Sequence, residues 1–199
     1  MNTPNTSKYT ELKQGNAVAF GDDLTIALIQ PSDLIDIIAM LNDERVNQYL
    51  FFAPADNSFY EGYFNPLIES TQHAIESGNW AESLVFVIRD SAGKYMGMTA
   101  VTSVMFLTGN YEVGYQLPYH AWRQGIATRA CQLMVDIGFH QLGAHKISAD
   151  CYASNVGSYK TLEKCGFVAE GCQKDYYKTE HGFDDKLYYG LTQAAFNAR

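Results

Sequence analysis

The sequence lacks an excess of positive charge. It has 14 lysines and arginines against 22 aspartates and glutamates, which gives a formal net charge of −8. Binding to a nucleic-acid backbone usually depends on a basic surface, so this balance argues against a direct nucleic-acid partner. An acidic protein suits a cationic partner such as an amine, although the same balance is common because it favours solubility.

The sequence also lacks the patterns that indicate disulfides, metal ligands or membrane insertion. Its four cysteines form no Cys-x-x-Cys pair, and none of its five histidines stands at metal-ligand spacing, so no metal is predicted. There is no apolar run long enough to span a bilayer and no signal-peptide pattern at the start. We therefore expect a cytoplasmic protein with reduced thiols in its core or on its surface and no membrane partner.

The chain shows no internal repeat and no sign of a second domain. Residues 1–16 are polar and poor in large apolar groups, which predicts a flexible N-terminal arm. Residues 17–199 are enough to bury a substantial core, and we expect them to form one domain.

Hydrophobic periodicity predicts an α/β fold. A helix is predicted after Ser32, and others over 67–77, from Gly125 to about Gly143, and over 156–164. Strands are predicted at 24–29, 84–89, 95–104, 111–117, 146–151, 167–170 and 186–191. This order indicates a mixed, mostly antiparallel central sheet flanked by helices.

Residues 46–79 concentrate aromatic side chains around Pro54 and Pro66. Two interpretations are open. The aromatic residues could form a lid facing a substrate, or they could pack a helix against the sheet; the second use is commoner and is the one we favour.

The stretch EVGYQLPYHAWRQGIATRA, residues 112–130, is typical of an anion-binding turn. A strand ends at Pro118, and Gly125 opens a helix whose first backbone N–H groups have no intrahelical partner and lie at the positive end of the helix dipole. Glycine also lets a ligand approach the backbone closely. Taken alone, the pattern fits equally an ordinary strand, turn and helix with glycine for tight packing.

Three pieces in order resemble the GNAT superfamily of acetyl-CoA-dependent N-acetyltransferases and, within it, the RimJ/RimL branch, whose members acetylate the N-termini of ribosomal proteins. The pieces are EVGYQL with WRQGIAT, a spacer helix and strand, and then NVGS (155–158) followed by LEKCGF (162–167). They span roughly the C-terminal half. The resemblance implies the GNAT fold, acetyl-CoA as co-substrate, and direct attack by a primary amine, either a protein N-terminus or a small amine, in a ternary complex.

The resemblance also implies the residues that bind the co-substrate. The superfamily motif is Gln/Arg-x-x-Gly-x-Gly/Ala; Gly125 and Ala127 match it, and Trp122 departs from it. The backbone N–H groups that would surround the pyrophosphate are those of Arg123, Gln124, Gly125, Ile126, Ala127 and Thr128. The strand Tyr115, Gln116 and Leu117 would pair with the pantetheine arm, so strand 146–151 must splay away there. Asn155 is a natural N-cap, and in the family it also binds the pantetheine.

The chemistry of amines suggests the catalytic residues. An amine arrives largely protonated and must lose a proton, and Glu112, acting through water, is the predicted base, with Asp150 and Asp175 as rivals. Many members use a tyrosine to protonate the departing thiolate, but that position is Leu162 here, so Ser158 is the candidate acid and Tyr159 the alternative.

A backbone N–H near Gln116 or Leu117 would meet the developing oxyanion. The alternative function is a non-catalytic CoA-binding regulatory module. We expect residues 46–79 and 175–185 to determine specificity, and exposed aromatic residues there would suit a homodimer.

Overall fold

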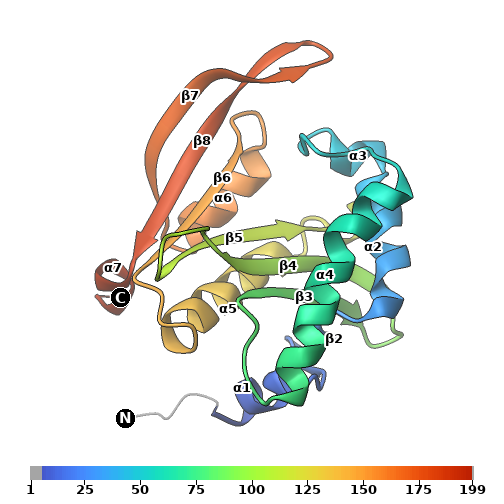
Figure 1. The fold of residues 1–199 in the computed structure, drawn as a ribbon. Helices are drawn as coiled ribbons and strands as arrows, with labels where there is room; N and C mark the ends of the chain where they lie inside the picture. The colour runs from blue at the N-terminus through green and yellow to red at the C-terminus, as the bar shows by residue number, and fades with distance from the viewer. Residues whose placement is uncertain (1–5, 199) are drawn as a thin grey trace.

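The computed structural model describes residues 6–198, which are built around one eight-stranded sheet (Figure 1). The strand order is β1-β2-β3-β4-β5-β6-β8-β7; β5 and β6 run parallel, and the other neighbours run antiparallel. The strands are β1 (Val18–Ala19), β2 (Leu24–Leu28), β3 (Ser83–Asp90), β4 (Tyr95–Ser103), β5 (Asn110–Gln116), β6 (Lys146–Tyr152), β7 (Val168–Thr179) and β8 (Gly182–Thr192). The mixed, mostly antiparallel sheet predicted from the sequence is confirmed.

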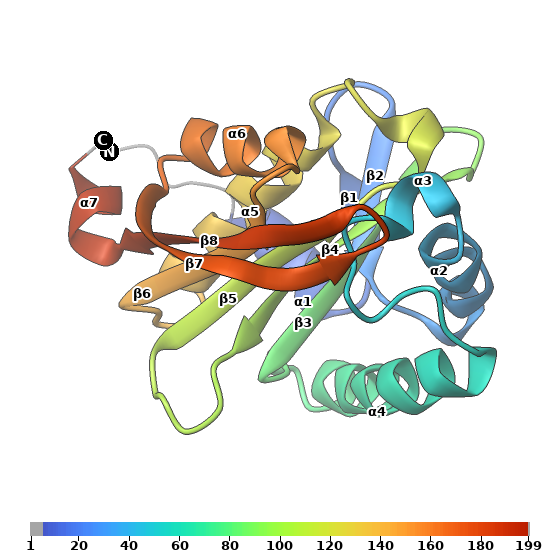
Figure 2. The same ribbon diagram turned by 90° about the horizontal axis from the view of Figure 1, so that it is seen from above.

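Helices cover both faces of the sheet, which explains the unbroken apolar run in β3. Helices α5 and α6 lie on one face, and α2 and α4 lie on the other (Figure 2). Leu84, Phe86 and Ile88 point into a core shared with α5 and α6, whereas Val85 and Val87 point into a second core shared with α2 and α4. The helices are α1 (Thr6–Lys13), α2 (Leu34–Leu41), α3 (Glu44–Asn47), α4 (Asn57–Glu76), α5 (Ile126–His140), α6 (Val156–Lys164) and α7 (Gln193–Asn197), with short 3₁₀ turns at Pro31–Asp33 and Tyr119–Ala121.

The N-terminal segment differs from the flexible arm predicted over residues 1–16. Residues 1–5 lie outside the described part of the chain, but Thr6–Lys13 form helix α1. Leu12 is fully buried in the core that contains α5, and the Lys13 ammonium lies 5.4 Å from the centroid of the Trp80 ring. One buried leucine docks this polar helix, which composition alone did not indicate.

Helix α4 begins at Asn57, ten residues before the predicted start at 67. Pro66 lies inside it and cannot donate the usual backbone hydrogen bond. The helix continues through this position because Tyr60, Phe64 and Ile68 are buried along one side against the sheet. Tertiary packing therefore outweighs the local cost of proline.

The last two strands form a hairpin much longer than predicted. Strands β7 and β8 extend to Thr179 and Gly182, well beyond the strands predicted at 167–170 and 186–191. Most of β7 is exposed to solvent, so it lacks the apolar alternation that would have revealed its length. The hairpin projects beyond the rest of the sheet (Figure 1).

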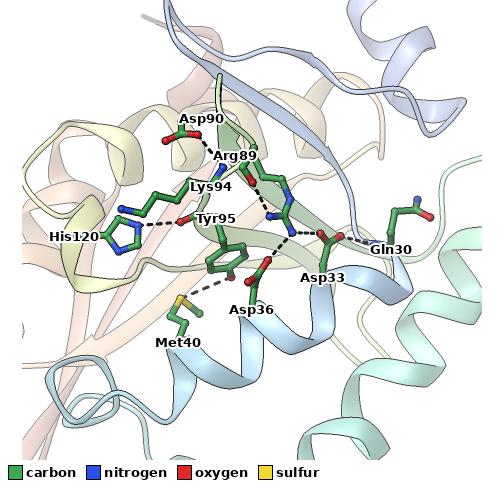
Figure 3. A network of polar contacts seen from close by, with 10 residues as sticks. Gln30, Asp33, Asp36, Met40, Arg89, Asp90, Lys94, Tyr95 and His120 are labelled. Carbon is green, nitrogen blue, oxygen red and sulfur yellow. Dashed lines mark hydrogen bonds and ion pairs between the residues drawn. The ribbon is translucent and has the colours of Figure 1, made fainter.

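A partly buried ion network fixes α2 to the sheet (Figure 3). Arg89 of β3 contacts Asp33 at 2.6 Å and Asp36 at 2.8 Å. The second Asp33 oxygen accepts a 2.8 Å hydrogen bond from the backbone N–H of Gln30, which closes the turn before α2. The Arg89 guanidinium also lies 5.7 Å from the centroid of the Tyr95 ring.

Within residues 6–198, none of the helices combines the length and apolarity needed to cross a membrane.

Candidate active site

The centre of the candidate site is the place where β5 and β6 separate. The two strands pair at Asn110 with Lys146, Tyr111 with Ile147 and Glu112 with Ser148, and the pairing ends there. The opening holds a cavity of about 190 Å³, called here the splay cavity, which reaches from α6 through the sheet to the loop after α3. The predicted splaying of strand 146–151 is therefore present in the structure.

Helix α5 presents its N-terminus beyond the end of β5. Gly125 is its N-cap with φ of 73°, a left-handed conformation that suits glycine, and no described atom lies within 4 Å of the place a Cβ would occupy. Ile126, Ala127 and Thr128 follow as the first helical residues, whose N–H groups have no intrahelical partner. Open space, free donors and the helix dipole together make this turn able to hold an anion.

Trp122, which departs from the superfamily motif, has a structural role in this turn. Its indole N–H donates a 2.8 Å hydrogen bond to the carbonyl of Leu117, and its ring lies 5.1 Å from that of Tyr119. The indole therefore ties the end of β5 to the start of α5. An anion held by backbone N–H groups does not require the Gln or Arg side chain that Trp122 replaces.

The structure brings together some of the predicted binding residues and not others. Tyr115, Gln116 and Asn155 line the splay cavity. Leu117 lies past the end of β5, is 9% exposed and does not line the splay cavity. In the α5 turn, Gln124 donates its side-chain N–H to the carbonyl of His120, while Arg123 is exposed with φ of 60°.

The candidate acid Ser158, on helix α6, lies on the cavity wall in contact with a tyrosine of strand β5. The Tyr115 hydroxyl donates a 2.9 Å hydrogen bond to the Ser158 carbonyl and lies 3.2 Å from the Ser158 hydroxyl. The Asn155 side chain accepts a 3.1 Å hydrogen bond from the Ser158 N–H, as expected of an N-cap. The alternative, Tyr159, does not line the cavity. Tyr115 and Ser158 are 43 positions apart, so no local signal joined them.

Burial keeps the phenol and thiol groups here neutral. It raises the pKa of Tyr115 well above its ordinary value, so this hydroxyl stays protonated and can donate a hydrogen bond at any physiological pH. Burial also raises the pKa of Cys151 to about 11, which leaves an unreactive thiol. Cys131, Cys151 and Cys165 are buried and Cys172 is exposed, all as free thiols.

The three carboxylates predicted as candidate bases have different surroundings in the structure. Asp150 faces the splay cavity but is occupied, since Lys186 lies 2.9 Å away and the Tyr177 hydroxyl donates a 3.2 Å hydrogen bond to it. Asp175 lies on the exposed hairpin and does not line the splay cavity. Glu112 lines the splay cavity, and its carboxylate has no hydrogen bond or ion pair with the described residues.

The surroundings of Glu112 favour its protonated form. Although solvent reaches its side chain, the surrounding protein desolvates the carboxylate and so raises its pKa above the usual range. Repulsion from Asp150 raises it further, and Lys186 opposes both effects. A carboxylate with a raised pKa and an unoccupied oxygen is suited to accept a proton.

A second cavity of about 410 Å³ lies between α4 and the strands β3, β4 and β5; it is called here the aromatic cavity. Glu112, Phe51 and Phe52 line both cavities, so the two adjoin at these residues. The packing interpretation of the aromatic segment is confirmed for Tyr60 and Phe64, which are buried in the core. Phe51, Phe59 and Tyr63 are exposed around the cavity, and a role facing a substrate stays a prediction for them.

Comparisons with known proteins agree with this architecture. The family model "Acetyltransferase (GNAT) domain" matches residues 23–168. The "Putative ribosomal N-acetyltransferase YdaF" of Bacillus subtilis is 24% identical over 172 residues, which cover 85% of this chain and 91% of that protein.

Solved structures share the fold at low identity. A spermidine N-acetyltransferase from Vibrio cholerae, solved with CoA and spermine, gives a TM-score of 0.73 at 20% identity over 88% of this chain and 98% of that one. A ribosomal-protein-S5-alanine acetyltransferase from Vibrio fischeri gives 0.68 at 23% identity over 88% and 96% of the two chains.

Proposed function

Since this chain belongs to the acetyltransferase (GNAT) family and is an N-acetyltransferase, we propose that it transfers the acetyl group of acetyl-CoA to a primary amine by direct attack in a ternary complex. The observation that carries this proposal is the separation of β5 from β6 beside Glu112. The separation exposes the backbone of one strand, an uncommitted carboxylate and the Ser158 hydroxyl to the same cavity.

The residues present fit acetyl-CoA, which when bound supplies an acetyl group activated as a thioester. The N–H groups of residues 123–128 would hold the pyrophosphate, and the space in front of Gly125 is open to receive it. Tyr115 and Gln116 lie on the edge of β5 that has lost its partner strand, so their backbone groups can pair with the pantetheine amides. Asn155 lies on the opposite wall.

Glu112 would remove a proton from the incoming ammonium group, directly or through water. The free amine then attacks the carbonyl carbon, so that a C–N bond forms and the C–S bond breaks. A backbone N–H on the open edge of β5, near Gln116 or Leu117, would stabilise the negative oxygen that develops in the transition state.

Ser158 would protonate the departing thiolate. As the amide forms, the nitrogen loses its second proton, which would return through water to the Ser158 hydroxyl. Tyr115 holds Ser158 in place, since its hydroxyl donates a hydrogen bond to the Ser158 carbonyl and lies 3.2 Å from the Ser158 hydroxyl. The products are an amide, CoA as a thiol, and one proton that Glu112 releases to solvent. Tyr115 thus supports in this chain a step that many members assign to a tyrosine at the position of Leu162.

Two classes of acceptor are suggested by the names of similar proteins, a ribosomal protein and spermidine. The resemblance to the RimJ/RimL branch is supported by the first class and the fold by both. Both carry primary amines, which is the level at which the present function is proposed.

The test is to mix the purified chain with acetyl-CoA and a panel of amines and N-terminal peptides, and to follow thiol release. Calorimetry measures acetyl-CoA binding separately. We expect binding, and turnover with at least one amine. Binding without turnover, unaltered by Glu112→Gln or Ser158→Ala, would instead indicate a non-catalytic CoA-binding regulatory module.

A further inference from the structure

We infer that the aromatic cavity selects the acceptor, and that the acceptor is a small primary monoamine carrying an aromatic or branched apolar group. This inference rests on the proposed function and extends it to the substrate class. The amine nitrogen would lie at Glu112, and the apolar group would fill the space between α4 and the sheet.

The two cavities meet at the residue that would accept the proton. Glu112 lines both, and so do its neighbours on β5, Val113, Gly114 and Gln116. An amine at this junction has the thioester site on one side and the aromatic cavity on the other. The aromatic cavity therefore adjoins the reaction site.

The walls of the aromatic cavity are apolar and held in place. Each exposed ring leans edge-on against a more buried one, with centroids 5.4 Å apart for Phe51 and Phe52, 5.8 Å for Phe59 and Tyr60, and 5.0 Å for Tyr63 and Phe64. The floor is made of Val85, Met98 and Ala100 from the sheet. These contacts leave apolar ring surface facing the cavity, which favours an apolar ligand group.

Charge excludes a polyamine from this cavity. Among the described residues that line it, Glu112 is the one charged side chain. The first ammonium of a polyamine would use Glu112, and the others would lie among rings without a carboxylate. An unpaired ammonium in apolar surroundings is strongly disfavoured, and stacking on a ring offsets only part of the cost.

Hydrogen bonding disfavours a peptide. A peptide carries a backbone N–H and C=O at every residue, and each needs a partner when buried. The backbone groups along α4 are bonded within the helix, and the Tyr60 hydroxyl is already used by Asn42 and the Ala55 N–H. The polar side chains left in the lining are those of Tyr63, Thr102, Glu112 and Gln116, fewer than the backbone groups of a buried peptide need. The volume of about 410 Å³ is in the range of small-molecule sites.

The experiment compares acceptors at equal concentrations with acetyl-CoA as donor, using phenethylamine, cyclohexylmethylamine, spermidine, and hexapeptides that begin with Phe or Ser. We expect kcat/KM for the two apolar amines to exceed that for spermidine and both peptides by at least about tenfold, since the ratio reports differential transition-state binding. A higher kcat/KM for spermidine or for either peptide would overturn the inference.

A variant pair tests whether the cavity itself sets the preference. Phe59→Glu adds a second carboxylate at the rim, and Phe59 is 53% exposed, so the change should be tolerated. We expect the preference for phenethylamine over spermidine to fall by about tenfold. The matched control is Phe106→Glu, the same substitution at a 95% exposed residue that lines neither cavity, and it should leave the preference unchanged.

The outcomes distinguish the inference from the proposed function. Turnover restricted to spermidine or peptides contradicts the substrate class and leaves acetyl transfer intact. Equal effects of Phe59→Glu and Phe106→Glu contradict the role of the cavity. Absence of thiol release with every acceptor, together with absence of acetyl-CoA binding, contradicts the proposed function itself.

Discussion

The two faces of the sheet contribute to the candidate site in different ways. On the face covered by α5 and α6, the binding groups are mainly backbone: the N-terminus of α5 and the open edge of β5. On the face covered by α2 and α4 (Figure 2), six of the residues that line the aromatic cavity carry aromatic side chains. Glu112 and the separation of the strands connect the two faces.

This difference between the two faces predicts which substitutions each should tolerate. A backbone site depends on conformation and access, so it should be sensitive to a change at Gly125 and insensitive to most side chains around it. A site made of side chains should change its preference when one ring is replaced. Substitutions at four places in the molecule test this contrast, in decreasing order of effect.

The largest effect should come from the group that both faces share. Glu112→Gln removes the proposed base and should lower kcat by about a hundredfold or more while leaving acetyl-CoA affinity unchanged. Because desolvation raises the pKa of Glu112, the acidic limb of kcat/KM should lie above pH 4.5, with activity rising as the carboxylate loses its proton. This limb should disappear in the variant.

The control is Asp150→Asn, which changes the carboxylate already bonded to Lys186 and Tyr177. We expect it to keep the acidic limb. If Asp150→Asn loses the limb and Glu112→Gln retains it, the assignment of the base is reversed.

The next effect concerns the placement of the side-chain face. Asp33→Ala removes a buried partner of Arg89 and leaves the Gln30 N–H without its acceptor, and it should lower the free energy of unfolding by about 2 kcal/mol. Urea denaturation measures it. Asp36→Ala, at the more exposed partner, should cost less than about 1 kcal/mol. Equal losses would show that the buried carboxylate has no special role.

The backbone face is tested by Gly125→Val, which we expect to weaken acetyl-CoA binding by about tenfold because a side chain would enter the space beside the helix N-terminus. Gly78→Val is matched, since Gly78 also has positive φ and open space around it but follows α4. Both should lose similar stability, and calorimetry should show weaker binding for Gly125→Val alone. Arg123→Ala should bind nearly as the parent does.

The smallest effects should come from the proton donors. A thiol has a reference pKa near 8.5 and leaves readily as thiolate, so we expect Ser158→Ala to lower kcat by about fivefold and Tyr115→Phe by about threefold. Tyr111→Phe, on the same strand, is the control and should not change kcat. An unchanged kcat in Tyr115→Phe would assign its hydroxyl to structure alone.

The backbone face was largely predictable because its signals are local. The Asn155 cap, the helix Val156–Lys164 and the glycine that opens α5 all appear where the sequence placed them. Capping and left-handed glycines depend on a few adjacent residues, which a sequence displays directly. Leu117 is an exception, since β5 ends one residue earlier and the Leu117 carbonyl is taken by Trp122.

Contacts between side chains were much less predictable because they join distant residues. On the face covered by α5 and α6, Tyr115 meets Ser158 across 43 positions, and elsewhere Asp150 meets both Tyr177 and Lys186 on the hairpin. The sequence showed that residues 46–79 are rich in aromatics but could not divide them between core and cavity. That division depends on which side of α4 faces the sheet.

The family resemblance, the order of the longer strands and of helices α2, α4, α5 and α6, and the glycine turn before α5 could be read from the sequence, because motifs, short-range periodicity and capping encode them. The elements α1, α3, α7 and β1 could not. Only the tertiary structure shows that Asp150 is paired while the Glu112 carboxylate has no hydrogen bond or ion pair with the described residues. It also shows that Tyr115 contacts Ser158 and that six aromatic rings line a cavity beside the splayed strands. The physical reason is that burial, pairing and desolvation arise only when segments far apart in the chain are packed together.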